Sequence, residues 1–184
     1  MLENISKGIS EELSKGISKI LPDFSLIPIT KENYMDVWDV YQSNNPYFLA
    51  AYGKDVHPNN ILQTWERLVE GYDATQQLFF GLWQDATPIA PIAPIAVVEL
   101  LPHFPEVGTL WLSEIIIHNN AKNQGLGTKI VQAITSAAKK DGQHSQIQLG
   151  IGNENPTAKA FWQKNGFTII DTYEDMTTMQ QLNF

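Results

Sequence analysis

A glycine-containing loop between an apolar strand and an apolar helix is the segment whose residue types and spacing could do chemistry. The strand is predicted over 109–117 and the helix over 125–140. The loop between them includes Lys122-Asn123-Gln124-Gly125-Leu126-Gly127-Thr128. Glycine leaves the backbone open to a ligand, and the first N–H groups of a helix have no intrahelical partner. Such a loop binds anions, and a pyrophosphate is a natural ligand for it.

Two other phosphate-binding patterns do not fit this loop. It lacks the third glycine of a dinucleotide-binding fingerprint and the Gly-Lys-Ser/Thr of a P-loop. NAD and ATP are therefore less favoured than another carrier of a pyrophosphate. Glycines also shape turns for purely conformational reasons, so an unrelated α/β module without a cofactor stays an alternative.

A second pattern follows about thirty residues later and contains Asn155, Ala158, Gly166 and Phe167. Together the two segments resemble the GNAT family of acyl-CoA-dependent N-acyltransferases. That family is marked by a strand, a loop with Arg or Gln before x-x-Gly-x-Gly/Ala, and a later Asn-x-x-Ala and Gly-Phe. The resemblance covers residues 109–170. It implies transfer of an acetyl group from acetyl-CoA to a primary amine of a small molecule or peptide, by direct attack in a ternary complex.

The resemblance also implies which residues bind coenzyme A. The backbone of the strand end should pair with the pantetheine amides, and main-chain N–H groups of the loop should surround the pyrophosphate. The asparagine of the second pattern should hydrogen-bond the pantetheine arm, with two residues of the following helix beside it. The implied set is Ile115, Ile116, Ile117, Lys122, Asn123, Gln124, Gly125, Leu126, Gly127, Thr128, Asn155, Phe161 and Lys164.

The sequence departs from the family pattern at two positions. Lys122 stands where Arg or Gln is usual, and binding should survive because much of the contact there is main-chain. Trp162 stands where many members have a tyrosine that protonates the leaving thiolate. An indole N–H is not a useful acid. A catalytically silent acyl-CoA-binding or scaffold domain of the same fold is therefore the alternative function.

The attacking amine must lose a proton, and a carboxylate can accept it. Glu114 on the predicted strand is our candidate base, and Glu99 on the neighbouring strand is the second. The best-known acid on this strand in the family falls nearer to Trp111 here, and Glu114 could instead be a structural carboxylate paired with a cation. A backbone N–H at a bulge of the same strand should stabilise the oxyanion.

Composition narrows the remaining classes of function. The net charge of −8 argues against nucleic-acid binding, and the absence of cysteine excludes disulfides and thiolate metal sites. The four histidines have no ligand spacing, so we expect no metal. No window reaches the roughly 20 apolar residues that span a bilayer, and the N-terminus lacks the apolar core of a signal peptide. We therefore expect a cytoplasmic protein without a membrane span.

The first half of the chain is predicted to be mostly helical. Residues 1–21 form an amphipathic helix, an extension to an acyltransferase domain over 22–184. This helix packs either on its own domain or on a second subunit, which leaves a homodimer open. A strand over 24–29 precedes two helices, over 31–42 with Thr30 as N-cap and over 58–70. The aromatic loop between these helices either recognises the acceptor, together with the C-terminal strands, or packs in the core. Its residues are Tyr47, Phe48, Tyr52 and Asp55.

The second half is predicted to be α/β. Strands over 77–83 and 95–101 are joined by an extended connection in which Pro-Ile-Ala occurs three times. A strand over 146–151, a helix over 156–164 and two further strands complete the chain. The resemblance implies a mixed α/β fold of three α/β/α layers, with a mostly antiparallel sheet of about seven strands. Two parallel strands of that sheet should splay around coenzyme A.

Overall fold

The computed structural model describes residues 2–66, 72, 74–84 and 94–182. Its elements are α1 (Leu2–Ile20), β1 (Phe24–Pro28), η1 (Tyr34–Val37), α2 (Trp38–Ser43), α3 (Asn45–Tyr52), α4 (Pro58–Leu62), η2 (Gln63–Trp65), η3 (Ala74–Gln76), β2 (Leu78–Gln84), β3 (Pro94–Pro102), β4 (Thr109–Ile117), η4 (Asn119–Ala121), α5 (Leu126–Asp141), β5 (Gln146–Gly152), α6 (Pro156–Lys164), β6 (Thr168–Thr172) and β7 (Met176–Leu182).

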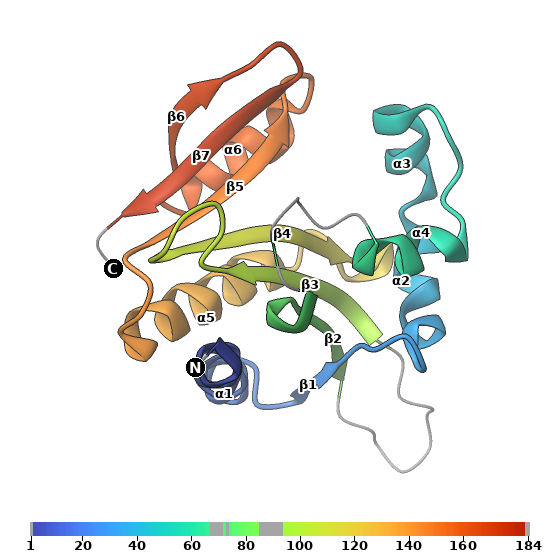
Figure 1. The fold of residues 1–184 in the computed structure, drawn as a ribbon. Helices are drawn as coiled ribbons and strands as arrows, with labels where there is room; N and C mark the ends of the chain where they lie inside the picture. The colour runs from blue at the N-terminus through green and yellow to red at the C-terminus, as the bar shows by residue number, and fades with distance from the viewer. Residues whose placement is uncertain (1, 67–71, 73, 85–93, 183–184) are drawn as a thin grey trace.

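The strands form one mixed sheet, in the order β1-β2-β3-β4-β5-β7-β6. Every neighbouring pair is antiparallel except β4 and β5, which are parallel and joined through α5. Such a strand–helix–strand unit places its helix against one face of the sheet. Figure 1 shows α1 and α5 on one face and the group α2, α3 and α4 on the other. The predicted mixed sheet and three-layer arrangement are confirmed.

Helix α1 packs on its own chain. Ile9, Leu13 and Ile17, which recur at helical spacing, are buried in the same core as Ile134 of α5. The two helices approach closely at Gly16, where an added Cβ would lie 3.3 Å from the backbone oxygen of Ala133. The sequence left two packing partners open for the apolar face of this helix, its own domain and a second subunit. The structure shows this face packed on its own domain.

The segment after β1 folds differently from the predicted helix over 31–42. Thr30 does not cap an α-helix, because its backbone N–H donates to Asn33 Oδ1 at 2.7 Å in a local turn. The Asn33 amide also donates to the carbonyl of Pro28 at 3.2 Å. Side-chain bonds of this kind offer the backbone an alternative to helix. A 3₁₀ turn follows, and the α-helix begins only at Trp38.

The predicted aromatic loop is also corrected, because residues 45–52 form helix α3. Pro46 lies in its first turn, where the missing N–H costs nothing, and Gly53 ends it with φ +67°. Proline thus starts a helix here rather than ending one. The predicted helix over 58–70 is α4 followed by the short 3₁₀ helix η2, and residues 67–70 lie outside the described residues. The Pro-Ile-Ala repeat also lies outside them until Pro94, which opens β3.

A buried polar cluster joins the β3–β4 turn to the α5–β5 turn. His144 Nδ1 lies 2.6 Å from Asp141 Oδ2, and both side chains are fully buried. His103 stacks on His144 with ring centroids 4.7 Å apart, and its Nδ1 accepts from the N–H of Gly108 at 3.0 Å. A neutral His103 therefore carries its proton on Nε2. Burial and the neighbouring His144 lower the pKa of His103.

This cluster predicts that acid weakens the fold. A histidine with a lowered native pKa favours folding fully above its unfolded value of about 6.5, and that contribution is lost as the pH falls through the native pKa. Protonation would also set a second N–H against that of Gly108. In His103→Asn, which tolerates the φ of +60°, the free energy of unfolding should fall less between pH 7.5 and 5.5. Urea titrations at the two pH values measure this.

The matched control is His57→Asn, which replaces an exposed helix-capping histidine with another capping residue. This variant keeps His103, so its free energy of unfolding should fall more between pH 7.5 and 5.5 than that of His103→Asn. Equal losses of stability in all three proteins would show that His103 does not carry the effect.

Candidate active site

Strands β4 and β5 pair only at one end. The parallel pairs are Thr109 with Gln146, Leu110 with Ile147 and Trp111 with Gln148. Beyond Trp111 none of the strands formed by the described residues lies beside the same edge of β4, while its other edge stays paired with β3 as far as Ile117. Figure 1 shows β5, β7 and β6 leaning away from β4 as a separate arm, with α6 against it. The predicted splay of two parallel strands is therefore present.

A bulge lies in β4 where it leaves β5. Glu99 of β3 pairs with Glu114, but the next residue of β3, Leu100, pairs with Leu112. Ser113 is thus the extra residue, and it reverses the side on which the following side chains lie. Leu112 packs in the core under α1 and α5, whereas Ile116 packs in the core under α2 and α4. The predicted bulge is present, and the role of its N–H as an oxyanion donor stays a prediction.

The bulge brings Glu114 to the α2 side of the sheet. There Tyr41 of α2 donates a hydrogen bond from its hydroxyl to Glu114 Oε2 at 2.5 Å. The carboxylate is half-buried, and none of the ion pairs among the described residues includes it. Burial, together with the negative charge of Glu99, raises the pKa of Glu114 to about 8, although the bond from Tyr41 opposes this rise. A carboxyl group with this pKa can take a proton near neutral pH.

Glu99 is the more enclosed of the two acids. It is only 7% exposed, and the Gln77 side-chain amide donates to Glu99 Oε1. Burial raises the pKa of Glu99, and hydrogen bonds from Ser113 and Gln77 lower it in part. Glu99 is therefore closed in by its partners, whereas Glu114 is the more exposed of the two carboxylates.

The C-terminal end of α2 holds the loop that follows β4. Asn44 donates from Nδ2 to the carbonyl of Ile117 at 3.0 Å and accepts through Oδ1 from the Lys122 ammonium. Ser43 Oγ accepts from the N–H of Asn119 at 3.1 Å. The Lys122 side chain is therefore directed to Asn44, and burial lowers its pKa. Its contribution to a ligand would come from the main chain, as predicted for the loop as a whole.

The two glycines of the loop are needed for different structural reasons. Gly125 has φ +79°, precedes helix α5, and no side chain caps the first turn. Gly127 is buried, and a Cβ there would lie 3.2 Å from both Ile117 Cδ1 and Phe161 Cζ. Gly125 therefore sets the turn that exposes the helix N-terminus, whereas Gly127 lets α5 pack closely against β4 and α6. Asn123 also has a positive φ, of 62°.

The second sequence pattern builds helix α6. Asn155 is its N-cap and accepts from the N–H of Ala158 at 2.9 Å. Phe161 and Trp162 pack against the main core, and Trp162 makes edge contacts with Phe161 and with the buried Phe167. Trp162 is thus a packing residue. Lys164 lines a groove between α5 and α6 that also includes Thr128.

Sequence reasoning missed the two side chains of α2 that organise this region. Tyr41 lies near the end of the predicted helix over 31–42 and Asn44 just beyond it, and neither residue is assigned a role from the sequence alone. Their partners, Glu114 and Ile117, both lie 73 residues further along the chain. No local pattern indicates such contacts.

Neither a metal site nor a membrane helix is found in the part of the chain that the structure describes. Across residues 2–66, 72, 74–84 and 94–182, no three His, Asp or Glu side chains are grouped to hold a metal ion. Among the same residues no helix is both long and apolar enough to cross a bilayer.

Comparison with solved structures gives close matches of fold. An acetyltransferase from Thermus thermophilus superposes with a TM-score of 0.68 at 22% identity, covering 87% of this chain and 97% of that one. The PaiA N-acetyltransferase from Thermoplasma acidophilum, in complex with coenzyme A, gives 0.60 at 17% identity, with 87% and 99% covered. Spermidine N-acetyltransferase from Vibrio cholerae, in complex with CoA and spermine, gives 0.62 at 14% identity, with 88% and 96% covered.

Comparison with curated proteins gave no match. The family comparison is decisive, because the model of the acetyltransferase (GNAT) family matches residues 37–167, which is most of the chain. That span contains the bulged strand, the glycine loop and the capped helix described above. The chain therefore belongs to the GNAT family of acetyltransferases, a family of acyl-transferring enzymes.

Proposed function

We propose that this protein transfers an acetyl group from acetyl-CoA to a primary amine of a small molecule or peptide, by direct attack in a ternary complex. The observation that carries the proposal is the coincidence of three features on β4. The strand leaves its parallel neighbour after Trp111, bulges at Ser113, and presents the Glu114 carboxylate at the next residue. An open strand edge, a backbone N–H at a bulge and a carboxylate that can act as base thus lie within a few residues of one another along β4.

Several groups support the proposed binding of a CoA pyrophosphate and pantetheine arm. The edge of β4 that β5 leaves, over Ile115, Ile116 and Ile117, offers backbone groups to an extended amide chain, apart from the Ile117 carbonyl, which already accepts from Asn44. The uncapped first turn of α5 offers N–H groups and a positive helix end to a diphosphate. Lys164 of α6 lines a groove with Thr128 of that turn, and Asn155 is the N-cap of the same helix. Phe161 contributes by packing beside Gly127.

In the proposed reaction Glu114 accepts a proton from the amine while the amine nitrogen attacks the thioester carbonyl. The N–C bond forms, and the negative charge on the carbonyl oxygen is stabilised by a backbone N–H at the Ser113 bulge. The C–S bond then breaks and the thiolate leaves. Trp162 is packed between Phe161 and Phe167, so the thiolate is protonated by water or another hydroxyl.

The packing of Trp162 also supports a second function. A domain of this fold without a side-chain acid could bind acyl-CoA and not turn it over. This catalytically silent domain would bind CoA with normal affinity but release no thiol with any amine in a broad panel. The position of Glu114 favours the enzyme, because this carboxylate, held by Tyr41 where the sheet opens, has a shifted pKa, and shifted acids are concentrated at catalytic sites.

Acetyl-CoA should stabilise the protein, and a negative charge at position 125 should abolish the effect. At about 100 times Kd, binding adds about 2.7 kcal/mol to the free energy of unfolding. Gly125→Asp and Gly125→Asn have the same shape, and both residues tolerate the φ of +79°. Only the aspartate repels a pyrophosphate, so its Kd should be about ten-fold or more weaker than that of the asparagine variant. Thermal shift and calorimetric titration with acetyl-CoA measure this.

Equal affinities of the two variants for acetyl-CoA would show that the N-terminus of α5 is not part of the binding site. No stabilisation of the original protein by millimolar acetyl-CoA would overturn the function itself.

The rate should depend on pH through Glu114. A base works when it is deprotonated, so kcat/KM should rise with pH up to about 8 and level off above the pKa. Glu114→Gln should lower kcat by about 10²-fold to 10⁴-fold while acetyl-CoA binding is kept. Tyr41→Phe removes a hydrogen bond that holds the pKa down, so its profile should shift to higher pH. A thiol-release assay across pH 6–10 gives all three profiles.

Stability supplies an independent check on this titration. A carboxyl whose native pKa is raised favours folding below its unfolded value of about 4.5, and that contribution is lost as the pH rises through about 8. Glu114→Gln should therefore gain stability relative to the original protein between pH 6 and 9. A constant difference over that interval would show that Glu114 does not titrate there.

A further inference from the structure

The gap between β4 and β5 has a closed end at their last pair, Trp111 with Gln148. Both side chains lie on the face of the sheet that carries Glu114, because Leu110 and Leu149, their neighbours along the strands, are buried in the core on the opposite face. In the proposed function the pantetheine arm runs along β4 from the glycine loop toward this end. The acyl group, which lies beyond the thioester, would therefore meet the side chains around the closed end.

Gly150 leaves a hollow on this face, two residues beyond Gln148 on β5. Its φ is not positive, so the backbone conformation does not require glycine there. A Cβ at this position would lie 2.6 Å from Met176 Sδ and 3.6 Å from Trp111 Cζ2. Met176 comes from β7, where it pairs with Gly152, and its thioether turns back over Gly150. The thioether and the indole thus occupy the space that a side chain at position 150 would take.

The indole and the thioether differ in how firmly they are held. Trp111 meets Phe104 edge to face with ring centroids 5.6 Å apart, and Phe104 meets Tyr72 in the same way at 6.0 Å. The hydroxyl of Tyr72 donates to the carbonyl of Pro102 at 3.2 Å. Met176 is 37% exposed and ends in a flexible thioether. Trp111 is therefore a fixed wall of the hollow and Met176 a movable one.

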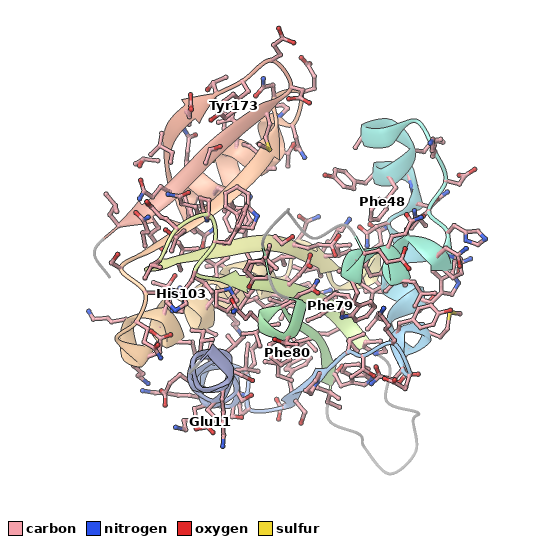
Figure 2. The ribbon with its side chains drawn as sticks, viewed as in Figure 1. Glu11, Phe48, Phe79, Phe80, His103 and Tyr173 are labelled. Carbon is pink, nitrogen blue, oxygen red and sulfur yellow. The ribbon has the colours of Figure 1, made fainter. Side chains whose placement is uncertain are left out.

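The face above the closed end is open to solvent. Figure 2 shows side chains gathered where β5 and β7 approach β4. Ser113 is exposed, and Trp111 and Gly150 are partly exposed. A small acyl group can therefore lie at this end of the gap while the partly exposed Glu114 stays accessible to an amine. A longer chain that continues in the same direction would reach the thioether of Met176.

We infer that Met176 and Trp111 limit the transferred acyl group to acetyl. The inference rests on the proposed acyl transfer and names the residues that select its donor. An acetyl group ends at its methyl carbon, whereas each further methylene must displace the thioether that already fills the hollow at Gly150. A close-packed site has no space for both. Met176 is thus the specificity-determining residue, and Trp111 is the wall behind it.

The direct test is equilibrium binding of two thioesters to the original protein. Calorimetric titration compares acetyl-CoA with butyryl-CoA, whose acyl chain is longer by two methylenes. We expect butyryl-CoA to bind about ten-fold or more weakly, because surplus methylenes at a closed apolar site have effects of this size. Equal or tighter binding of butyryl-CoA would overturn the inference.

Three variants test the wall itself. Met176→Ala opens the hollow and should bring the affinity for butyryl-CoA up to that for acetyl-CoA. Adding Gly150→Ala to this variant should restore the preference for acetyl-CoA, because the new Cβ lies 2.6 Å from the former position of Met176 Sδ. Met35→Ala is the matched control, since Met35 is also exposed but lies in η1. It should bind the two thioesters as the original protein does. An unchanged ratio of affinities in Met176→Ala would show that Met176 does not limit the acyl chain.

Turnover of the same two thioesters separates this inference from the proposed function. Equally fast thiol release from acetyl-CoA and butyryl-CoA, with an amine that the protein acylates, would refute the limit on chain length and leave acyl transfer intact. Preferential binding of acetyl-CoA without thiol release in the presence of any amine would refute acyl transfer and still support the limit. Failure of the original protein to bind either thioester would overturn both.

Discussion

The one extra residue at Ser113 is the constraint on which the rest of the site depends. Without the bulge, strand alternation would turn Glu114 toward the face covered by α1 and α5, among Leu110 and Leu112. An ionised carboxylate in that apolar core would be costly. The bulge instead turns Glu114 toward Tyr41 at the point where β4 leaves β5. A single register shift thus sets the face of the sheet on which the proposed base lies.

Helix α2 connects the proposed base to the proposed cofactor loop. Tyr41 bonds Glu114, and Asn44, three residues later on the same helix face, bonds Ile117 and Lys122. A movement of α2 would disturb both groups together. The polar bonds at its C-terminal end therefore do more than cap a helix: they keep the loop and the base in one fixed relation while the arm of β5, β7 and β6 is held by separate contacts.

Elements with a continuous apolar pattern could be predicted from the sequence. Elements whose backbone conformation depends on hydrogen bonds from particular side chains could not. The strand over 109–117 and the helix over 156–164 were predicted at their observed bounds, because periodic apolar residues and Asn155 mark them. Residues 31–55 were not, because Asn33 bonds the backbone of Thr30 and Pro46 starts a helix in a context that resembled a loop. The candidate base was found by residue type. Its raised pKa could not be predicted, because burial beneath residues distant in sequence causes it.

Acid should act on this protein at two separate points. At the closed end, where β4 and β5 pair, His103 and the Asp141–His144 pair clamp the adjoining turns. Burial lowers the pKa of His103 there, but the same physical cause raises the pKa of Glu114 to about 8 at the open end. Burial disfavours whichever form is charged, so it moves an acid and a base in opposite directions. The site should therefore lose its proposed base at a pH where His103 is still neutral, and catalysis should decline well before the fold that supports it.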